Sequence, residues 1–333
     1  MPIYVNAGGV WSEGKPYINV AGAWKLAKEA WVNISGIWKR LWATNTWVAR
    51  APMPTARNGA AAASPGNNKI YVFGGYNGVS PYNVNANEEY DIMSNTWTTK
   101  ASMPLSLSGH AAASPGNGKV YSIGGEDPDD YSHNYEYNPA TNSWTQISDM
   151  PGPQELAAAV SLGNGKIYSI GGWDVNARTP SPNGYTLEYD VVTDTWTQKA
   201  NMLTARRSLG AASPGNGKIY AVGGSTGSVL MPTPSNANEE YDPATNTWTA
   251  KAPAPTSGDC DAASPGNGKV YKISPSATEE YDPNTNTWAV KAQIPVSGMP
   301  GCIAVGKNGK IYAFGGYADS IYLANVQEYT PDS

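Results

Sequence analysis

A tandem repeat constrains the fold of this chain more than any other feature. A triplet of lysine, isoleucine or valine, and tyrosine occurs six times, and a pair of glycines follows five of these triplets. Each repeat then has a glutamate–tyrosine pair, and five have a turn containing tryptophan; the sixth such tryptophan precedes the first repeat. The turn tryptophans are Trp47, Trp97, Trp144, Trp196, Trp248 and Trp288. Their spacings of 50, 47, 52, 52 and 40 residues indicate repeated supersecondary units.

Each repeat predicts four short strands. In the first repeat these strands are expected at 59–64, 69–73, 87–91 and 96–100. An Asn-Gly pair after the first strand, present in later repeats, favours a tight hairpin turn with positive φ. Asp-Pro-x-Thr-Asn favours a turn between the third and fourth strands. The alanine-rich first strand suits a crowded position near a central axis.

These motifs resemble kelch repeats over about residues 43–333. The resemblance implies a β-propeller with four antiparallel strands in each blade around a central channel. Residues 44–50 supply a lone fourth strand, whereas the chain ends just after a third strand. We therefore expect the two ends to complete a sixth blade, which removes an open sheet edge. The predicted fold is an all-β, six-bladed, kelch-type propeller.

Residues 1–42 contain a different, shorter repeat at 4–11, 17–24 and 31–38. Each copy has a glycine-containing turn, so the segment predicts a meander of three hairpins, separate from a propeller at 43–333. The motif resembles short repeats of bacteriophage tail and other virion proteins. That resemblance implies a module binding other virion proteins or sister copies, and the alternative is a small sheet that caps the propeller. The attachment residues would be Trp11, Trp24, Trp31, Trp38 and Trp42.

Composition excludes several classes of protein. The chain has 22 basic and 27 acidic residues without a basic block, so a nucleic-acid partner is not expected. Its apolar runs are too short for membrane insertion, and no secretory signal is readable. The predicted location is the virion; a cytoplasmic location and export without a readable signal are the alternatives. Cys260 and Cys302 are expected as buried thiols rather than a disulfide, and no cofactor is expected.

The loops between the second and third strands, and those between repeats, vary in sequence and are expected on one face. Varied loops on a rigid scaffold usually carry recognition. Aromatic rings with carboxylates and arginine suit a sugar, although a protein partner would use similar anchors. The alternative for the rings is that they only pack the loops. For Arg57 and Arg206, which lie in equivalent Thr-Ala-Arg motifs between repeats, a structural role is preferred and ligand contact is the alternative. The candidate ligand-binding residues are Tyr76, Tyr82, Glu126, Tyr131, Trp173, Arg178, Tyr185, Tyr317, Arg57 and Arg206.

Catalysis and metal binding are the remaining alternatives. Asp127, Asp129 and Asp130 offer oxygen ligands for Ca²⁺, but their spacing matches no EF-hand and a solvated acidic loop is preferred. Copper radical oxidases of the kelch type need several histidines, and this chain has two. Sialic-acid mutarotases need glutamate and arginine in the channel, so this enzyme stays an alternative, as does an intracellular interaction scaffold. The leading hypothesis is a non-enzymatic phage virion protein that recognises a host-surface glycan or protein.

Overall fold

The computed structural model describes residues 17–20, 23–26, 29–34, 37–126, 132–174, 181–228, 231–296 and 298–332. The chain divides into two compact units. One unit comprises Met1–Thr46 with Thr330–Ser333, and the other comprises Trp47–Tyr329. The described residues form strands and turns without a helix, so the all-β fold class is confirmed. We consider each unit by itself.

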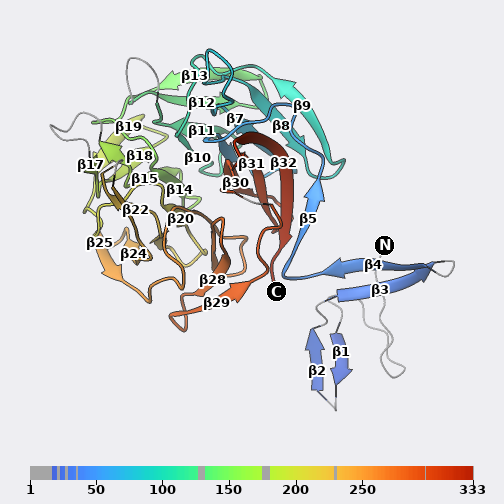
Figure 1. Ribbon diagram of the computed structural model, residues 1–333. Helices are drawn as coiled ribbons and strands as arrows, with labels where there is room; N and C mark the ends of the chain where they lie inside the picture. Colours follow the sequence, from blue (N-terminus) through green and yellow to red (C-terminus); the bar gives the residue numbers. More distant parts are fainter. Residues whose placement is uncertain are drawn as a thin grey trace. The chain divides into compact units, whose positions relative to one another are not determined.

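The larger unit is a propeller of six four-stranded antiparallel blades (Figure 1). We name the strands of a blade a to d from the axis outward. Blade 1 contains β6 (Ala61–Ala63), β7 (Lys69–Phe73), β8 (Asn87–Asp91) and β9 (Thr96–Lys100). Blade 2 contains β10 (Ala111–Ala113), β11 (Val120–Ile123), β12 (Asn134–Asn138) and β13 (Ser143–Ile147). Blade 3 contains β14 (Ala158–Ser161), β15 (Lys166–Ile170), β18 (Thr186–Asp190) and β19 (Thr195–Gln198).

The other three blades have the same strand order. Blade 4 contains β20 (Gly210–Ala212), β21 (Ile219–Val222), β24 (Asn238–Asp242) and β25 (Thr247–Ala250). Blade 5 contains β26 (Asp261–Ala263), β27 (Val270–Ile273), β28 (Thr278–Asp282) and β29 (Thr287–Lys291). Blade 6 contains β30 (Cys302–Val305), β31 (Ile311–Ala318), β32 (Ile321–Thr330) and β5 (Thr46–Arg50).

Blade 6 is completed from both ends of the chain, as predicted. Strand β5 lies at the outer edge of the sheet in the order β30-β31-β32-β5. It begins two residues later than predicted because Asn45 forms a turn with φ of 52° and donates its backbone N–H to the Thr330 carbonyl. The closed ring therefore leaves each blade packed against two neighbours.

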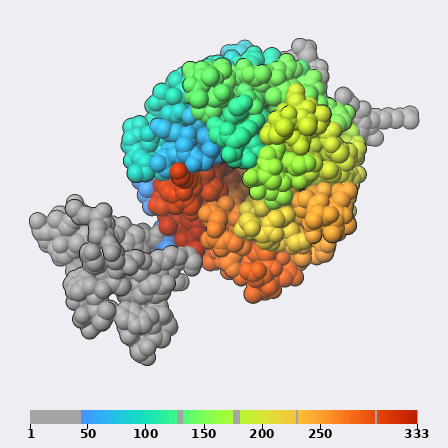
Figure 2. Space-filling view, turned by 180° about the vertical axis from the view of Figure 1, so that it is seen from behind, coloured from blue at the N-terminus to red at the C-terminus, as the bar shows by residue number. Residues whose placement is uncertain are grey.

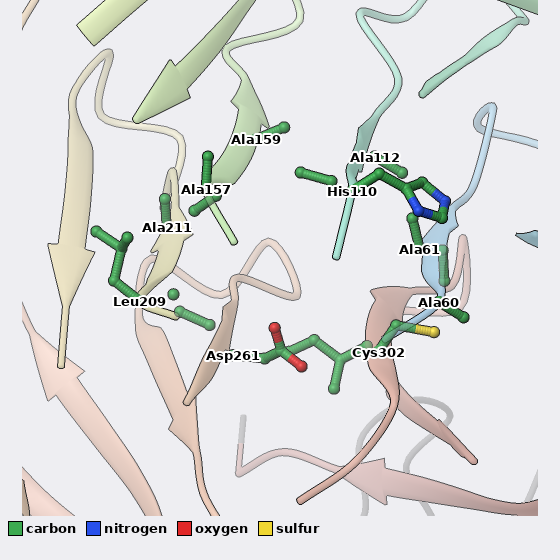
Figure 3. A pocket seen from close by; sticks show the side chains of 16 residues that line it. Ala60, Ala61, His110, Ala112, Ala157, Ala159, Leu209, Ala211, Asp261 and Cys302 are labelled. Atoms are coloured by element: carbon green, nitrogen blue, oxygen red, sulfur yellow. The ribbon is translucent and has the colours of Figure 1, made fainter. Parts of the chain in front are cut away.

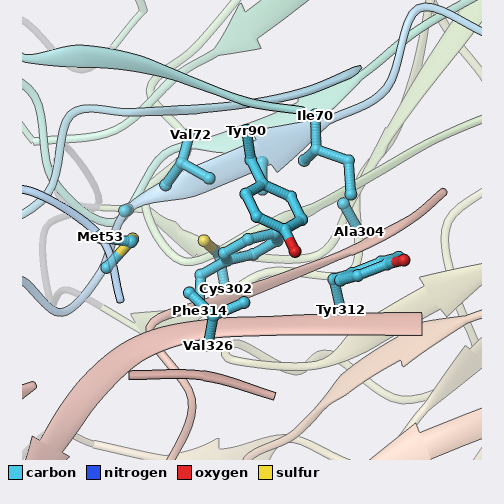
Figure 4. Packing of buried hydrophobic residues seen from close by; sticks show 11 residues of the cluster. Met53, Ile70, Val72, Tyr90, Cys302, Ala304, Tyr312, Phe314 and Val326 are labelled. Carbon is cyan, nitrogen blue, oxygen red and sulfur yellow. The ribbon is translucent and has the colours of Figure 1, made fainter. Parts of the chain in front are cut away.

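The hydrophobic core lies between the blades. Figure 4 shows the cluster between blades 1 and 6, where Tyr90 packs beside Phe314 with ring centroids 6.2 Å apart. Each blade also donates an indole N–H to a backbone carbonyl at the end of the preceding blade, as Trp97 does to Ala51 at 2.9 Å. The corresponding bonds of the other blades come from Trp47, Trp144, Trp196, Trp248 and Trp288. The repeated tryptophan thus joins neighbouring blades.

The two ends of the propeller differ. The end that carries the a–b and c–d turns is called the turn face here, and the end that carries the b–c and d–a connections is called the loop face. Two loop-face connections contain extra hairpins, β16 (Trp173–Asp174) with β17 (Ser181–Pro182) and β22 (Ser225–Gly227) with β23 (Pro232–Pro234). In blade 6, β31 and β32 extend as one long hairpin.

The smaller unit contains two described hairpins. Strand β1 (Tyr17–Val20) pairs with β2 (Ala23–Leu26), and β3 (Glu29–Ile34) pairs with β4 (Ile37–Ala43). Each pair is a separate two-stranded sheet, and no ladder joins β2 to β3 among the described strands. The predicted continuous meander is therefore wrong for these two hairpins. The first predicted copy, residues 4–11, lies outside the described residues.

Candidate functional site

Glycine pairs position the loop face. Gly74 and Gly75 both have positive φ, and a Cβ on Gly74 would lie 2.7 Å from the Leu107 carbonyl of the next blade. Only glycine allows this approach without displacing backbone. The chain then crosses the d–a connection that leads into its own blade, where Tyr76 pairs with Asn58. Four other blades have an equivalent pair at Ser108–Glu126, Glu155–Trp173, Arg207–Ser225 and Met299–Tyr317.

The channel opens on the loop face in a cavity of about 400 Å³. Figure 2 shows one end of the propeller, where the blades surround a central hollow. The side chains after the glycine pairs do not line this cavity, although four of them, Tyr76, Glu126, Trp173 and Tyr317, are candidate ligand-binding residues. Their bridge partners Asn58, Arg207 and Met299 line it instead, because the d–a connections lie closer to the axis. The charged residues of the lining are Arg207, Asp259 and Asp261.

The channel narrows below the mouth to a cavity of about 100 Å³, shown in Figure 3. Most of its lining side chains are alanines from the a strands, among them Ala61, Ala112 and Ala159. Asp261, at the start of β26, lines both this waist and the mouth. Burial raises the pKa of its carboxyl to about 7. His110 also lines both cavities, and burial lowers its pKa to about 3, so its imidazole is neutral near pH 7.

Arg207 lines the mouth of the channel, and the sequence prediction missed it. Its guanidinium lies over the Trp173 ring, 5.1 Å from the centroid, which is a cation–π contact. Its Nε is buried without a hydrogen-bond partner. The tandem arginines 206 and 207 were the available signal, since the equivalent pair in the first repeat is Arg57 and Asn58.

Trp173 was predicted as a ligand-binding residue, and the structure buries its ring. Its side chain is only 6% exposed, because Arg207 covers the ring. Trp173 therefore supports the Arg207 side chain rather than offering its own face to a ligand. Beside them, burial raises the pKa of Glu155 to about 7; nearby Glu126 raises it further and Arg207 opposes the shift.

Tyr76, Tyr82, Tyr317 and Tyr322 form an aromatic cluster that we call the tyrosine surface. Tyr76 and Tyr82 stack with centroids 5.8 Å apart and planes inclined by 8°. Tyr322 joins them to Tyr317, with centroid distances of 5.5 Å to Tyr76 and 4.9 Å to Tyr317. Tyr82 is 51% exposed and Tyr317 is 42% exposed. Tyr76, Tyr82 and Tyr317 were predicted as ligand-binding residues, but the assembly of the four rings across blades 1 and 6 was not predicted.

Arg57 and Arg206 were candidate ligand residues, and the structure places both inside the blades, fully buried. Arg57 donates to the carbonyls of Gly74 and Ala86 and to Glu88, the latter at 2.5 Å. Arg206 makes the equivalent carbonyl bonds in blade 4, and its Nη2 lies 3.3 Å from Glu239. Both guanidiniums are therefore used by the framework, which agrees with the structural interpretation of these arginines and corrects their assignment as ligand-binding residues.

The other predicted residues fall in different places. Glu126 is exposed, and Tyr185 packs partly buried against the core between blades 2 and 3. Tyr131, Arg178, Asp127, Asp129 and Asp130 lie outside the described residues. Cys260 and Cys302 are buried free thiols, as predicted. Within the described ranges, no three histidine, cysteine or carboxylate side chains are grouped for metal binding.

Two comparisons with known proteins complete the description of the site. Residues 31–264 match the family described as Attractin/LZTR1 beta-propeller, a span that includes blades 1 to 4. No curated protein matches the chain. The match does not reach residues 1–30, so the resemblance of the short repeats to phage proteins stays a prediction. The described part of the chain contains no helix long and apolar enough to cross a membrane.

Proposed function

Because the chain belongs to the Attractin/LZTR1 β-propeller family and folds as a binding scaffold, we propose that it recognises a glycan through the tyrosine surface. The observation that carries this proposal is the stacked, solvent-facing pair of Tyr76 and Tyr82. Tyrosine combines an apolar ring with a polar hydroxyl. The rings cover the apolar face of a sugar, while hydroxyls and neighbouring amides fix its hydroxyl groups.

A glycan array tests this proposal with the wild-type protein and the double variant Tyr82→Ala/Tyr317→Ala. We expect at least tenfold weaker binding by the double variant, because both exposed rings are lost. Val290→Ala is the matched control, since Val290 is 69% exposed on β29, an outer strand. Equal array signals for the double variant and the wild-type protein would refute the tyrosine surface as the glycan site.

A protein partner is the second candidate, and exposed aliphatic side chains favour it. Val79 and Ile321 are 67% and 61% exposed and belong to the same two loop-face connections as the tyrosines. Clustered tyrosines beside aliphatic groups are typical of interface hot spots. Host cells separate the two candidates. Periodate treatment of the cells abolishes glycan binding, whereas protease treatment abolishes binding to a protein.

We propose the virion as the location and residues 1–42 as the attachment module, with other virion proteins or sister copies as partners. The support is the threefold sequence repeat and the two short hairpins, each with little core of its own. Removal of residues 1–42 is expected to abolish particle attachment or self-association while the propeller stays folded. Normal assembly of the truncated protein would overturn this role.

We also propose that the protein is not an enzyme. The mutarotase alternative relied on Arg57, Arg206 and Glu126 in the channel. Both arginines are buried within blades, and Glu126 is absent from the described lining of the mouth. Sialic acid followed by NMR should therefore exchange its anomers at the uncatalysed rate. Catalysed exchange that tracks protein concentration would restore the enzyme hypothesis.

A further inference from the structure

One carboxylate breaks the sixfold pattern of the channel waist. The first residue of each a strand pairs with the last core position of its b strand, as Ala61 does with Phe73 and Asp261 with Ile273. The residues at this position in blades 1 to 6 are Ala61, Ala111, Ala158, Gly210, Asp261 and Cys302. Five blades thus place a small or apolar side chain there, and blade 5 alone places a charge.

The Asp261 carboxylate has no partner within the part of the chain that the structure describes. No hydrogen bond or ion pair to this carboxylate is described. By contrast, the buried glutamates of the c strands are paired with cations, as Glu88 is with Arg57. Figure 3 shows Asp261 at the pocket, among side chains that are mostly alanine. Asp261 is partly buried and lines the channel, so its carboxylate is accessible from the cavity. A cationic group that enters the channel can therefore pair with it.

The walls of the mouth define the rest of the ligand. Leu209, Met299 and Pro300 line the mouth together with Asp261, so they can cover a hydrocarbon stem. The cavity volume of about 400 Å³ falls within the range usual for small-molecule sites. Asp259 and Asp261 are the only carboxylates of the described lining, and Asp259 already accepts a hydrogen bond from Ser225, so the carboxylate ligands are too few for Ca²⁺. One ammonium group matches Asp261 in charge and hydrogen bonding.

The remaining charged groups at the mouth permit a cation. Arg207 lies over Trp173, and Asp259 accepts a hydrogen bond from Ser225 at 2.5 Å. His110 is neutral near pH 7 because burial lowers its pKa to about 3. The Asp261 carboxyl, whose pKa is about 7, is ionised above that pH, and Asp259 and Asp261 then give the lining two carboxylates against the one guanidinium of Arg207.

We propose that the loop-face mouth of the channel binds an alkylammonium group, with its ammonium on Asp261 and its alkyl stem against Leu209, Met299 and Pro300. This site is distinct from the tyrosine surface and does not depend on it. The ammonium belongs either to a free amine or to a lysine side chain of a partner protein, since both present the same chemistry.

The test uses n-butylamine, with n-butanol and butyrate as probes of similar size that lack the positive charge, in NMR titrations of the full chain. We expect n-butylamine to bind at least tenfold more tightly than either control. Asp261→Asn keeps the shape of the side chain but removes the charge, and it should lose at least tenfold in n-butylamine affinity. Asp319→Asn is the matched control on the exposed turn of the blade 6 hairpin and should bind as the wild-type protein does.

Two further measurements make the test decisive. Asp261→Ala installs the residue that blades 1 to 3 carry at this position, so the variant should fold and have an unchanged or higher Tm. A large drop in Tm would indicate a structural role for Asp261 and would overturn the proposal, as would unchanged n-butylamine binding by Asp261→Asn. Loss of n-butylamine binding in Tyr82→Ala/Tyr317→Ala would also contradict two separate sites.

The source of the ammonium is resolved by a peptide with a central lysine and the same peptide with that lysine acetylated. Binding of the lysine peptide at least as tightly as n-butylamine identifies a protein partner. Binding of n-butylamine alone identifies a small amine. Where the lysine peptide binds, acetylation should abolish its binding, and tight binding of the acetylated peptide at this cavity would refute recognition of the charge.

Discussion

The turn face and the loop face are built from the same six repeats, yet they satisfy their polar groups differently. On the turn face, the c-strand tyrosine of a blade donates to the amide or carboxylate of the adjacent turn, as Tyr90 does to Asn95 at 2.8 Å and Tyr281 to Asn286 at 2.7 Å. On the loop face, the Nε of Arg207 and the carboxylate of Asp261 have no described partner.

This difference separates support from recognition. A closed hydrogen-bond network adds stability and leaves little for a ligand to satisfy, whereas an unpartnered polar group gains a bond only when a ligand arrives. Substitutions in the closed network should therefore change the free energy of unfolding. Substitutions of the unpartnered polar groups on the loop face should change ligand binding at a nearly constant free energy of unfolding.

The largest expected effect on the free energy of unfolding comes from Arg57→Ala, because Arg57 binds the backbone carbonyls that hold the loop-face connection of blade 1. The change leaves Glu88 buried and without its cation, and it removes donors from the carbonyls of Gly74 and Ala86. Removing one partner of a buried ion pair costs about 3–5 kcal/mol. Urea denaturation of the two proteins measures this loss.

Blade 2 supplies the control for this substitution. It carries Leu107 and Tyr135 where blade 1 carries Arg57 and Glu88, so the same space is filled there without charges. The double variant Arg57→Leu/Glu88→Tyr should be more stable than Arg57→Ala, because no buried charge is left alone. A single variant that loses less than about 1 kcal/mol would contradict the ion-pair argument.

The repeat explains why the fold was predictable and part of the site was not. Six copies of one pattern fixed the strands, and β7, β8 and β9 occupy the predicted residues. Side-chain direction at an irregular connection follows no such period. Arg206 and Arg207 are neighbours in sequence, but Arg206 is buried in blade 4 and Arg207 lines the mouth. Two residues adjacent in sequence therefore have different positions, one in the framework of the blade and one at the mouth of the channel.

Aromatic residues show the same limit of prediction. Trp173 and Tyr76 both follow a glycine pair, and sequence treated them alike. Trp173 is covered by Arg207, whereas Tyr76 stacks with Tyr82 near the solvent. The difference depends on the neighbouring side chains, because Arg207 comes from the connection that bridges Ser225 in the next blade, whereas Tyr82 comes from the same connection as Tyr76. Such partners come from connections whose geometry the repeat does not determine.

The second largest effect is on the pH dependence of stability, and it is tested with Glu155→Gln on the loop face. Burial and Glu126 raise the pKa of Glu155 to about 7 in the folded protein, against 4.5 in the unfolded chain, while Arg207 opposes the shift. Between these values the folded state binds more protons, so this carboxyl makes stability fall as pH rises. Below pH 4.5 both states are protonated and the penalty vanishes.

The amide of Glu155→Gln does not titrate. The free energy of unfolding of the variant, relative to that of the wild-type protein, should therefore rise by about 1–2 kcal/mol between pH 5 and pH 8. Thermal unfolding of both proteins at the two pH values gives this difference. A stability difference that does not change with pH, or that changes in the opposite direction, would show that the carboxyl is not held in its protonated form by the fold.

The smallest effect compares one hydroxyl on each face. Tyr281→Phe removes the turn-face bond to Asn286, whose Oδ1 then keeps only the backbone N–H of Ala252. We expect a loss of about 1 kcal/mol, the usual net value of such a bond. Tyr82→Phe removes a hydroxyl with no described partner from a ring that is 51% exposed, so stability should change by less than about 0.5 kcal/mol. Glycan binding should respond in the reverse order, weakening for Tyr82→Phe and staying unchanged for Tyr281→Phe. Equal stability losses in the two variants would contradict the distinction between the hydrogen-bonded side chains of the turn face and the unpartnered ones of the loop face.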